Sequence, residues 1–236
     1  MPHGKLVVVS FDKFTATVIM RKIFWLTPAV LALFSSCDHK PVKQGSITYA
    51  IEYELPDSLK HYSDYLPKIA IVYFKGDSTV SIQQAGEEAT TVITDKPSGF
   101  MRVLLRSSSA RYQVDYKKAE QADVLPPVNY GYATTSESKT IAGHKALKYI
   151  LTDKTTGLTS EAWFSKEVSV IPNYLTMVFD TTYGVPLAFD INQNGIATKT
   201  TVKEIKFEPI PDGVFAVPAG YKKISPQQFK NLPVGN

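Results

Sequence analysis

The sequence of 236 residues contains a single cysteine, Cys37. One cysteine cannot form an internal disulfide, which excludes the small secreted domains that disulfides hold together. No run of five or more Lys and Arg residues occurs, so the sequence lacks the basic footprint of a nucleic-acid-binding protein. The uncharged run 23–34 has twelve residues, whereas a membrane-spanning helix needs about 20. We therefore expect no nucleic-acid partner and no transmembrane helix.

Motifs of common enzyme classes are also missing, including G-x-S-x-G, H-E-x-x-H, phosphate loops and dinucleotide fingerprints. His61 and Asp64 could share a helix face, but a metal site takes three or four convergent ligands. The segment 190–195 resembles a calcium loop, yet Thr201 stands where the twelfth-position Glu is required, so we expect a hairpin turn there. The sequence thus predicts no enzyme activity, no metal and no cofactor.

The residues before Cys37 are typical of an export signal. Arg21 and Lys22 precede the apolar run 23–34, and Ser35 and Ser36 follow it. This order of basic, apolar and small residues is that of a secretory signal peptide. The stretch ending in Cys37 resembles the lipobox of bacterial lipoproteins in the looser form found in Bacteroidota-like members, with Phe34 in place of the usual aliphatic residue.

That resemblance implies that Cys37 is the lipid attachment site, because the cysteine of a lipobox receives a diacylglycerol and becomes the first residue after cleavage. Two or more acyl chains suffice for stable anchoring in a membrane. The alternative is a free or buried cysteine behind an ordinary signal peptide. The signal is complete from Met20 onwards, so we expect Met20 to be the true start.

These features divide the chain into a signal region (1–36), a lipid-anchored tether (37–45) and one β domain (46–236). The signal region has four basic residues and one acidic residue, and the remainder has 22 basic and 21 acidic residues. The basic character of the chain therefore belongs mostly to the export signal.

The domain has the alternation of a β protein. Apolar and polar residues alternate from Ser46 to Leu55, which predicts a half-buried strand. Further strands are predicted at 69–74, 78–84, 90–94, 100–106, 110–116, 135–141, 146–153, 158–165, 187–192 and 196–205. Short helices are predicted at 56–68 and 225–232, and the segment 167–185 is either a helix after Pro172 or an apolar loop. The fold class is mainly β, with one large curved antiparallel sheet that closes or wraps around the segments 56–68 and 167–185.

Four stretches carry a family resemblance: SKTIAGHKALKY at 138–149, EAWF at 161–164, GVPL at 184–187 and FAVPAGYK at 215–222. Their pattern and order resemble the periplasmic lipoprotein-carrier superfamily, the LolA/LolB-like group, over roughly residues 45–225. The resemblance implies a half-barrel, with short helices in its mouth and a concave apolar face that holds acyl chains. None of these stretches is catalytic.

The resemblance favours a lipid-anchored envelope protein that faces the periplasm and binds or carries a lipid or acyl chain on the concave face. The alternative is an envelope protein-interaction module with a filled core and no small ligand. Aromatic residues on predicted strands are the candidate ligand-binding residues, although cross-strand core packing would also explain them: Tyr49, Tyr53, Tyr112, Tyr116, Tyr149 and Trp163.

Overall fold

A computed structural model describes residues 44–123, 125, 129–193 and 196–232. The predictions for the signal region, Cys37, Met20 and the start of the tether lie outside these residues. Within the described part, twelve strands form one sheet. They are β1 (Gln44–Glu54), β2 (Ile69–Lys75), β3 (Ser78–Ala85), β4 (Glu88–Asp95), β5 (Phe100–Arg106), β6 (Arg111–Tyr116), β7 (Tyr130–Ile141), β8 (His144–Asp153), β9 (Thr159–Ser165), β10 (Val185–Gln193), β11 (Ile196–Lys206) and β12 (Lys222–Ile224).

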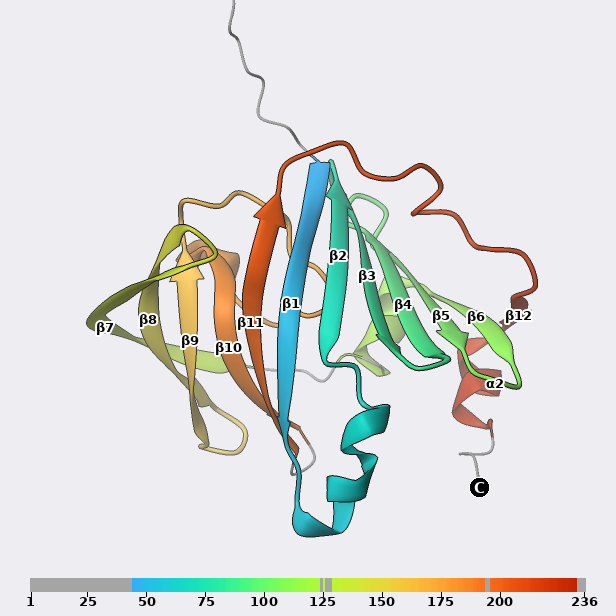
Figure 1. The fold of residues 1–236 in the computed structure, drawn as a ribbon, viewed down its shortest axis with the longest axis horizontal. Helices are drawn as coiled ribbons and strands as arrows, with labels where there is room; N and C mark the ends of the chain where they lie inside the picture. Colours follow the sequence, from blue (N-terminus) through green and yellow to red (C-terminus); the bar gives the residue numbers. More distant parts are fainter. Residues whose placement is uncertain (1–43, 124, 126–128, 194–195, 233–236) are drawn as a thin grey trace, which may run out of the picture. The chain divides into compact units, whose positions relative to one another are not determined.

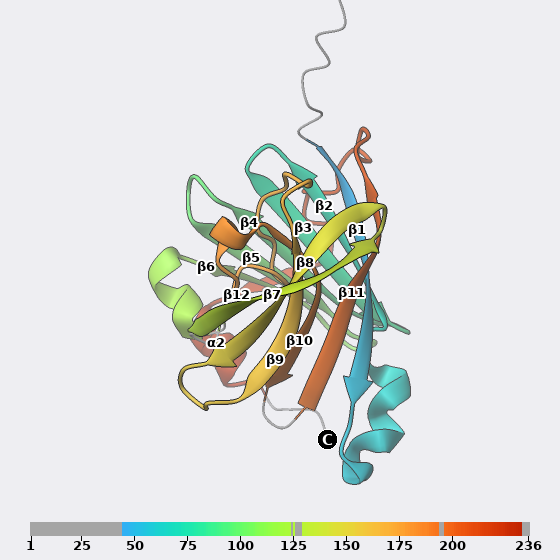
Figure 2. The ribbon, with the colours of Figure 1, turned by 90° about the vertical axis from the view of Figure 1, so that its left-hand side faces the viewer.

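The strands lie in the order β12-β6-β5-β4-β3-β2-β1-β11-β10-β9-β8-β7. The sheet is strongly curved and does not close, because β12 and β7 form its two edges (Figures 1 and 2). The mainly β half-barrel predicted from the sequence is therefore confirmed. One detail differs: β12 pairs with β6 in parallel, so the sheet is mixed and not wholly antiparallel.

Hairpin turns set most of this order, since consecutive antiparallel strands need only short connections. In the β7–β8 hairpin, Ile141 pairs with His144 across the two residues Ala142 and Gly143, whose φ angles are 48° and 83°. Positive φ at both central residues is the geometry of the two-residue turns that match the twist of the strands. This turn joins the two strands predicted at 135–141 and 146–153, and His144 begins β8.

Short helices complete the described structure: η1 (Asp57–Tyr65), η2 (Lys118–Asp123), η3 (Thr181–Tyr183) and α2 (Pro226–Lys230). The helix predicted at 225–232 is present as α2, and Ser225 caps it: the Ser225 hydroxyl accepts from the Gln228 amide, and the Gln228 side chain accepts from the Ser225 amide. The segment 167–180 is an irregular chain with turns and not a helix, so the loop alternative was the correct one.

The two faces of the sheet are covered differently. We call the face that bears Tyr49 the inner face; the segment 166–184 lies over it, inside the curve of the sheet (Figure 2). On the opposite, outer face, the chain between β11 and β12 packs Phe215, Val217 and Tyr221 against a small core on β3, β4 and β5. The inner face therefore holds the main core, and it is also where the sequence predicts a site.

Candidate functional site

One half of the inner face is filled. The segment 166–184 packs apolar side chains against β1, β2 and β8–β11; those side chains are Val168, Val170, Leu175, Val178, Phe179 and Tyr183. Rings interlock in this layer: the centroids of Tyr132 and Tyr183 are 4.2 Å apart and stacked, and those of Phe179 and Phe189 are 4.9 Å apart and edge to face. Most of this half of the sheet is therefore a packed core.

A buried hydrogen bond ties the filling segment to the centre of the sheet. The Asn173 side-chain amide donates to the Tyr49 hydroxyl at 3.0 Å, and both residues are at most 1% exposed. Burial raises the pKa of the Tyr49 hydroxyl above its ordinary value, and the bond from Asn173 offsets only part of that effect. Tyr49 therefore stays neutral and fixes the position of the segment.

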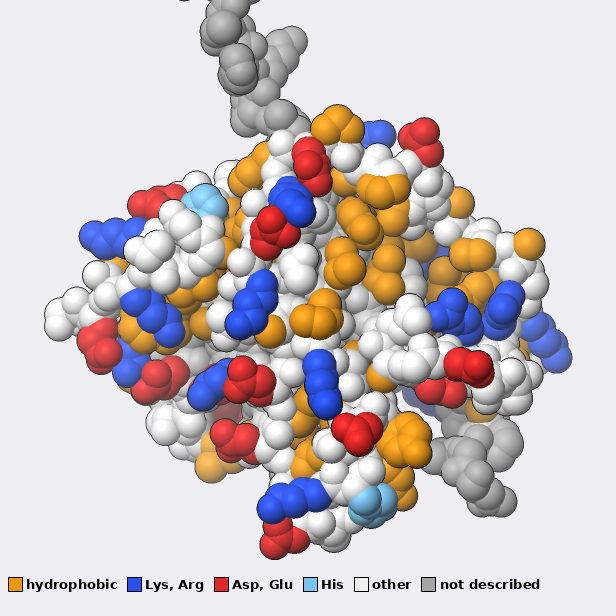
Figure 3. Space-filling view, in the orientation of Figure 1, with side chains coloured by type: hydrophobic (Ala, Val, Ile, Leu, Met, Phe, Trp, Pro, Cys, Tyr) orange, Lys and Arg blue, Asp and Glu red, His pale blue; other side chains and the backbone are white. Residues whose placement is uncertain are grey.

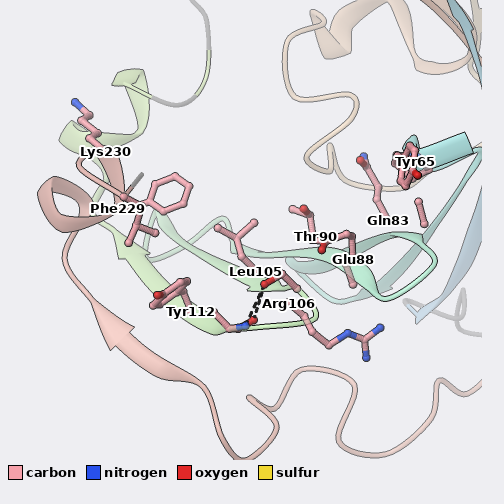
Figure 4. A pocket seen from close by; sticks show the side chains of 15 residues that line it. Tyr65, Gln83, Glu88, Thr90, Leu105, Arg106, Tyr112, Phe229 and Lys230 are labelled. Carbon is pink, nitrogen blue, oxygen red and sulfur yellow. Dashed lines mark hydrogen bonds between the residues drawn. The ribbon is translucent and has the colours of Figure 1, made fainter. Parts of the chain in front are cut away.

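The other half of the inner face is covered only in part: Tyr174 and Leu125 belong to a small core with Met101, Val114 and Tyr116, and beside this core the sheet is open. A groove of about 670 Å³ lies over β3–β6, between the end of η1 and the helix α2 (Figure 4). Leu105 and Tyr112, which are cross-strand partners, contribute its apolar floor, and Phe229 and Leu232 of the C-terminal segment form one wall. Gln83, Glu88 and Thr90 add polar groups from β3 and β4, and Tyr65 closes the opposite side.

A second cavity of about 250 Å³ adjoins the groove, because Gln83 lines both. Its walls come from β1, β10 and β11 and from the filling segment, with Ile51, Phe189 and Ile191 facing Leu175 and Val178. The Tyr53 hydroxyl donates to the Pro67 carbonyl at 3.0 Å, which holds the end of β1 against the chain that leads into β2. The two cavities lie side by side at Gln83, and both polar and apolar groups line each of them.

The structure separates the six candidate aromatic residues into three groups. Tyr112 lines the groove and Tyr53 lines the second cavity. Tyr49, Tyr116 and Tyr149 are on the same inner face but are at most 7% exposed and belong to the packed core.

Trp163 is on the outer face. Its neighbour Ala162 pairs with Tyr149, which is on the inner face, and successive residues of a strand point to opposite faces, so Trp163 and its partner Lys148 point outward. The Lys139 ammonium lies 4.0 Å from its ring centroid. Nearby, Lys148 bridges Glu137 and Glu161 at 3.2 and 2.8 Å. This arrangement is a cation–π contact beside an ion-pair network on the sheet surface, and it is separate from the groove.

Sequence reasoning missed several groove residues, namely Tyr65, Gln83, Leu105, Phe229 and Leu232. A signal existed for Leu105, since alternation in the 100–106 and 110–116 hairpin puts it on the same face as Tyr112. No local signal marks Phe229, because its position depends on the parallel pairing of β12 with β6. Tyr65 reaches the groove only through the turn of η1 between β1 and β2.

In the described part of the chain, no three His, Cys, Asp or Glu side chains come close enough to hold a metal ion. His61 is exposed on η1, with its ring beside that of Tyr62. The hairpin expected at 190–195 is present as the antiparallel pair β10–β11, although residues 194 and 195 lie outside the described residues. Among the described helices, none has the length and apolar character needed to cross a bilayer.

Comparison with known proteins gives distant structural similarity only. No protein-family model and no curated protein matches the chain. Two crystal forms of PNGF-II match 80% of the chain at 14% identity and a TM-score of 0.47, and the chain spans about a third (32%) of PNGF-II. LprF from Mycobacterium bovis matches 78% of the chain, and 93% of its own length, at 10% identity and a TM-score of 0.33. At these scores neither a family nor a function follows from the similarity.

Proposed function

We propose that this chain is a lipid-anchored envelope protein that binds a lipid or acyl chain on the concave face of its sheet. The observation that carries the proposal is the contrast between the two halves of that face. The segment 166–184 fills one half with apolar side chains, whereas the other half keeps a groove of about 670 Å³. A sheet face that is partly filled from its own chain and partly hollow suits a ligand that completes the core.

The lining of the groove supports an apolar ligand with a polar end. Its volume lies within the range of roughly 300–1,000 Å³ that is usual for small-molecule sites. The floor is one cross-strand row that is polar on β3 and β4 and apolar on β5 and β6, formed by Gln83, Thr90, Leu105 and Tyr112, and Phe229 and Leu232 add apolar surface beside it. Burying apolar surface contributes about 25 cal/mol per Å², so an alkyl chain in this groove gains affinity without any specific hydrogen bond.

The anchoring part of the proposal rests on the lipobox-like stretch ending in Cys37 and on the resemblance to periplasmic lipoprotein carriers over residues 45–225. A diacylglycerol on Cys37 would tether the domain to an envelope membrane facing the periplasm. Growth of a bacterial host with radiolabelled palmitate tests it: label is expected in the wild-type protein and not in Cys37→Ser. Equal labelling of both proteins would refute anchoring at Cys37.

Ligand binding is tested with the full chain carrying Cys37→Ser, so that no attached lipid contributes to the mass. Native mass spectrometry is expected to show a non-covalent adduct of lipid mass that denaturation removes. Leu105→Asp puts a carboxylate on the groove floor and is expected to abolish the adduct. Leu147→Asp is the matched control, because Leu147 is 40% exposed on β8 and does not line the groove. An adduct that persists in Leu105→Asp would refute the groove as the site.

A second candidate, an envelope protein-interaction module, is favoured by apolar side chains on the surface. Ile69 and Ile71 on the outer side of β2 are 46% and 36% exposed, and Phe207 is 44% exposed. Figure 3 shows hydrophobic side chains gathered over β2 and its neighbours. Crosslinking in cells separates the two candidates. The interaction module is favoured if one partner protein is crosslinked repeatedly, if Ile71→Asp abolishes that crosslink, and if the purified protein carries no lipid adduct.

We infer that the role does not include catalysis. His61 and His144, the described histidines, lie on η1 and at the start of β8, apart from the groove. A panel of hydrolase and transferase substrates should show no turnover; an activity that disappears in His61→Ala or His144→Ala would overturn this inference.

A further inference from the structure

The floor of the groove changes character along a single line of residues. Four side chains form one cross-strand row from β3 to β6: Gln83, Thr90, Leu105 and Tyr112. Residues directly opposite each other point to the same face of a sheet, and this row continues through β2 to Tyr49, which defines the inner face. One half of the row therefore presents an amide and a hydroxyl to the groove, and the other half presents an aliphatic and an aromatic side chain.

The polar half of the row has unused hydrogen-bonding capacity. Neither the Gln83 amide nor the Thr90 hydroxyl forms a side-chain hydrogen bond with another described residue. Further along the same face of β3 and β4, by contrast, the hydroxyls of Thr79 and Thr94 are bonded to each other at 2.6 Å. A glutamine amide and a threonine hydroxyl both donate and accept hydrogen bonds. The two groups can therefore bind a ligand that carries donors and acceptors of its own.

The charged residues around the groove do not favour an anion at this polar half. Three of them line the groove: Glu88, Arg106 and Lys230. Arg106 follows the inner-facing Leu105, so the register puts it on the outer face, and Figure 4 shows its guanidinium and the Lys230 ammonium directed away from the floor. Glu88 lies two residues from Thr90 on the same face of β4, so the charge nearest Thr90 along this strand is a carboxylate.

An uncharged head suits this surface better than a charged one. A charged head over Gln83 and Thr90 would lose water without gaining a counter-ion, which costs free energy. An anion would also be repelled by Glu88, whereas this carboxylate is exposed to water and attracts a cation only weakly. A neutral head with hydroxyl or amide groups exchanges its hydrogen bonds with water for bonds to the two side chains, at a small net gain.

We propose that the ligand of the groove is an uncharged amphiphile. Its head carries hydroxyl or amide groups and lies over Gln83 and Thr90, and its hydrocarbon lies over Leu105 and Tyr112, toward Phe229 (Figure 4). This inference rests on the proposed function and adds the ligand class to it. The chemistry that such heads share is a set of neutral groups that both donate and accept hydrogen bonds.

The test compares four probes that have saturated chains of the same length and different heads: 1-decanoylglycerol, decan-1-ol, decyl phosphate and decylamine. Binding is measured by isothermal titration calorimetry on the full chain with Cys37→Ser, below the critical micelle concentration of each probe. The uncharged glycerol ester is expected to bind about tenfold more tightly than decan-1-ol, which is about 1.4 kcal/mol and matches one or two additional hydrogen bonds. It should also bind at least about tenfold more tightly than either charged probe.

A pair of double variants locates the head. Gln83→Leu/Thr90→Val removes the hydrogen-bonding groups and nearly keeps the side-chain volumes, so it should abolish the preference for 1-decanoylglycerol over decan-1-ol. Gln84→Leu/Thr91→Val is the matched control and should keep the preference, because it makes the same two changes at the next residues of β3 and β4, which point to the outer face and line neither cavity. Melting curves verify that both variants fold. If the first does not, Thr90→Val alone is used and should reduce the preference at least about threefold, the loss of roughly one hydrogen bond.

The outcomes separate this inference from the function on which it rests. If decan-1-ol binds and 1-decanoylglycerol shows no preference, or if the preference survives in Gln83→Leu/Thr90→Val, the head site is refuted and the groove remains. The head site is refuted equally if the control loses the preference, or if the folded Gln83→Leu/Thr90→Val protein binds no probe. If decyl phosphate or decylamine binds as tightly as the glycerol ester, the ligand is not selected for an uncharged head. If no probe binds the wild-type groove, the proposed function itself fails.

Discussion

Replacing Tyr49 with phenylalanine removes one buried hydroxyl and leaves the ring in place. The Asn173 amide that donates to this hydroxyl at 3.0 Å would then be left without its acceptor in a site where Tyr49 is 0% and Asn173 1% exposed. An unsatisfied buried donor costs about 1–3 kcal/mol. In a domain of this size each kcal/mol shifts the melting temperature by roughly 2–4 °C, so we expect Tyr49→Phe to melt several degrees below the wild type.

The assay is thermal and urea unfolding of the full chain, followed by circular dichroism. Tyr53→Phe is the matched control, because it removes an equally short hydrogen bond, to the Pro67 carbonyl, at a half-buried position that water can reach. That change should cost less than about 1 kcal/mol. A Tyr49→Phe protein as stable as the wild type, or more stable than Tyr53→Phe, would refute the anchoring role of Asn173.

The same variant tests how the two halves of the inner face divide their roles. Tyr49 belongs to the packed core and does not line the groove, so Tyr49→Phe should keep its affinity for decan-1-ol. Tyr112→Ala, on the groove floor, should lower that affinity by about tenfold, since it removes an aromatic wall. Loss of binding in Tyr49→Phe at a temperature where it is folded would contradict this division.

Three further changes probe stability by urea unfolding. Asp115→Asn removes the carboxylate that holds Arg102 and Lys223, whose hydrogen bonds keep the pKa of Asp115 well below its usual range; it should cost about 1–3 kcal/mol at neutral pH. A carboxyl whose pKa is lower in the folded state stabilises the fold fully at pH values above its unfolded-state pKa, which is about 3.9. The difference in unfolding free energy between Asp115→Asn and the wild type should therefore shrink as the pH falls below that value. A difference that stays constant would contradict the ion pair. Gly184→Ala should cost about 1–3 kcal/mol, because φ is 111° and a Cβ would meet the Ser165 carbonyl; Gly157→Ala, with φ of 74° and open space around it, should cost less. Ser81→Ala should raise stability by up to about 1 kcal/mol, since the Ser81 hydroxyl is buried without a hydrogen-bond partner among the described residues, and a loss of stability would show that the hydroxyl has one.

Much of the fold is readable from local patterns. The strands with clear alternation were predicted to within a few residues, as in β1, whereas β7 begins at Tyr130 and not at the predicted residue 135. Ser225 as the cap of α2 and Pro226 at its first position were predicted from the sequence, and the structure adds the reciprocal bond of Gln228. These features depend on neighbours along the chain, and such neighbours are visible in a sequence.

Other features depend on partners that are distant in sequence. The strand β12 has three residues, too few to show alternation, and exists because it pairs with β6 more than a hundred residues earlier. Alternation puts Trp163 on one face of β9, but only the register with β8 shows that this face is the outer one. The same limit applies to the five candidate tyrosines, since all of them face inward and only packing decides which ones are covered.

The sequence by itself determined that the domain is mainly β, with strands on which apolar and polar residues alternate, because alternation and turn chemistry act over a few residues. The tertiary structure decided where the inner face is filled and where it is hollow. Segment 166–184 covers one half because Asn173 meets Tyr49 across 124 positions of sequence, and the C-terminal segment borders the other half because β12 docks on β6. A cavity is what packing leaves unfilled, and packing is a property of residues that come together only when the chain is folded.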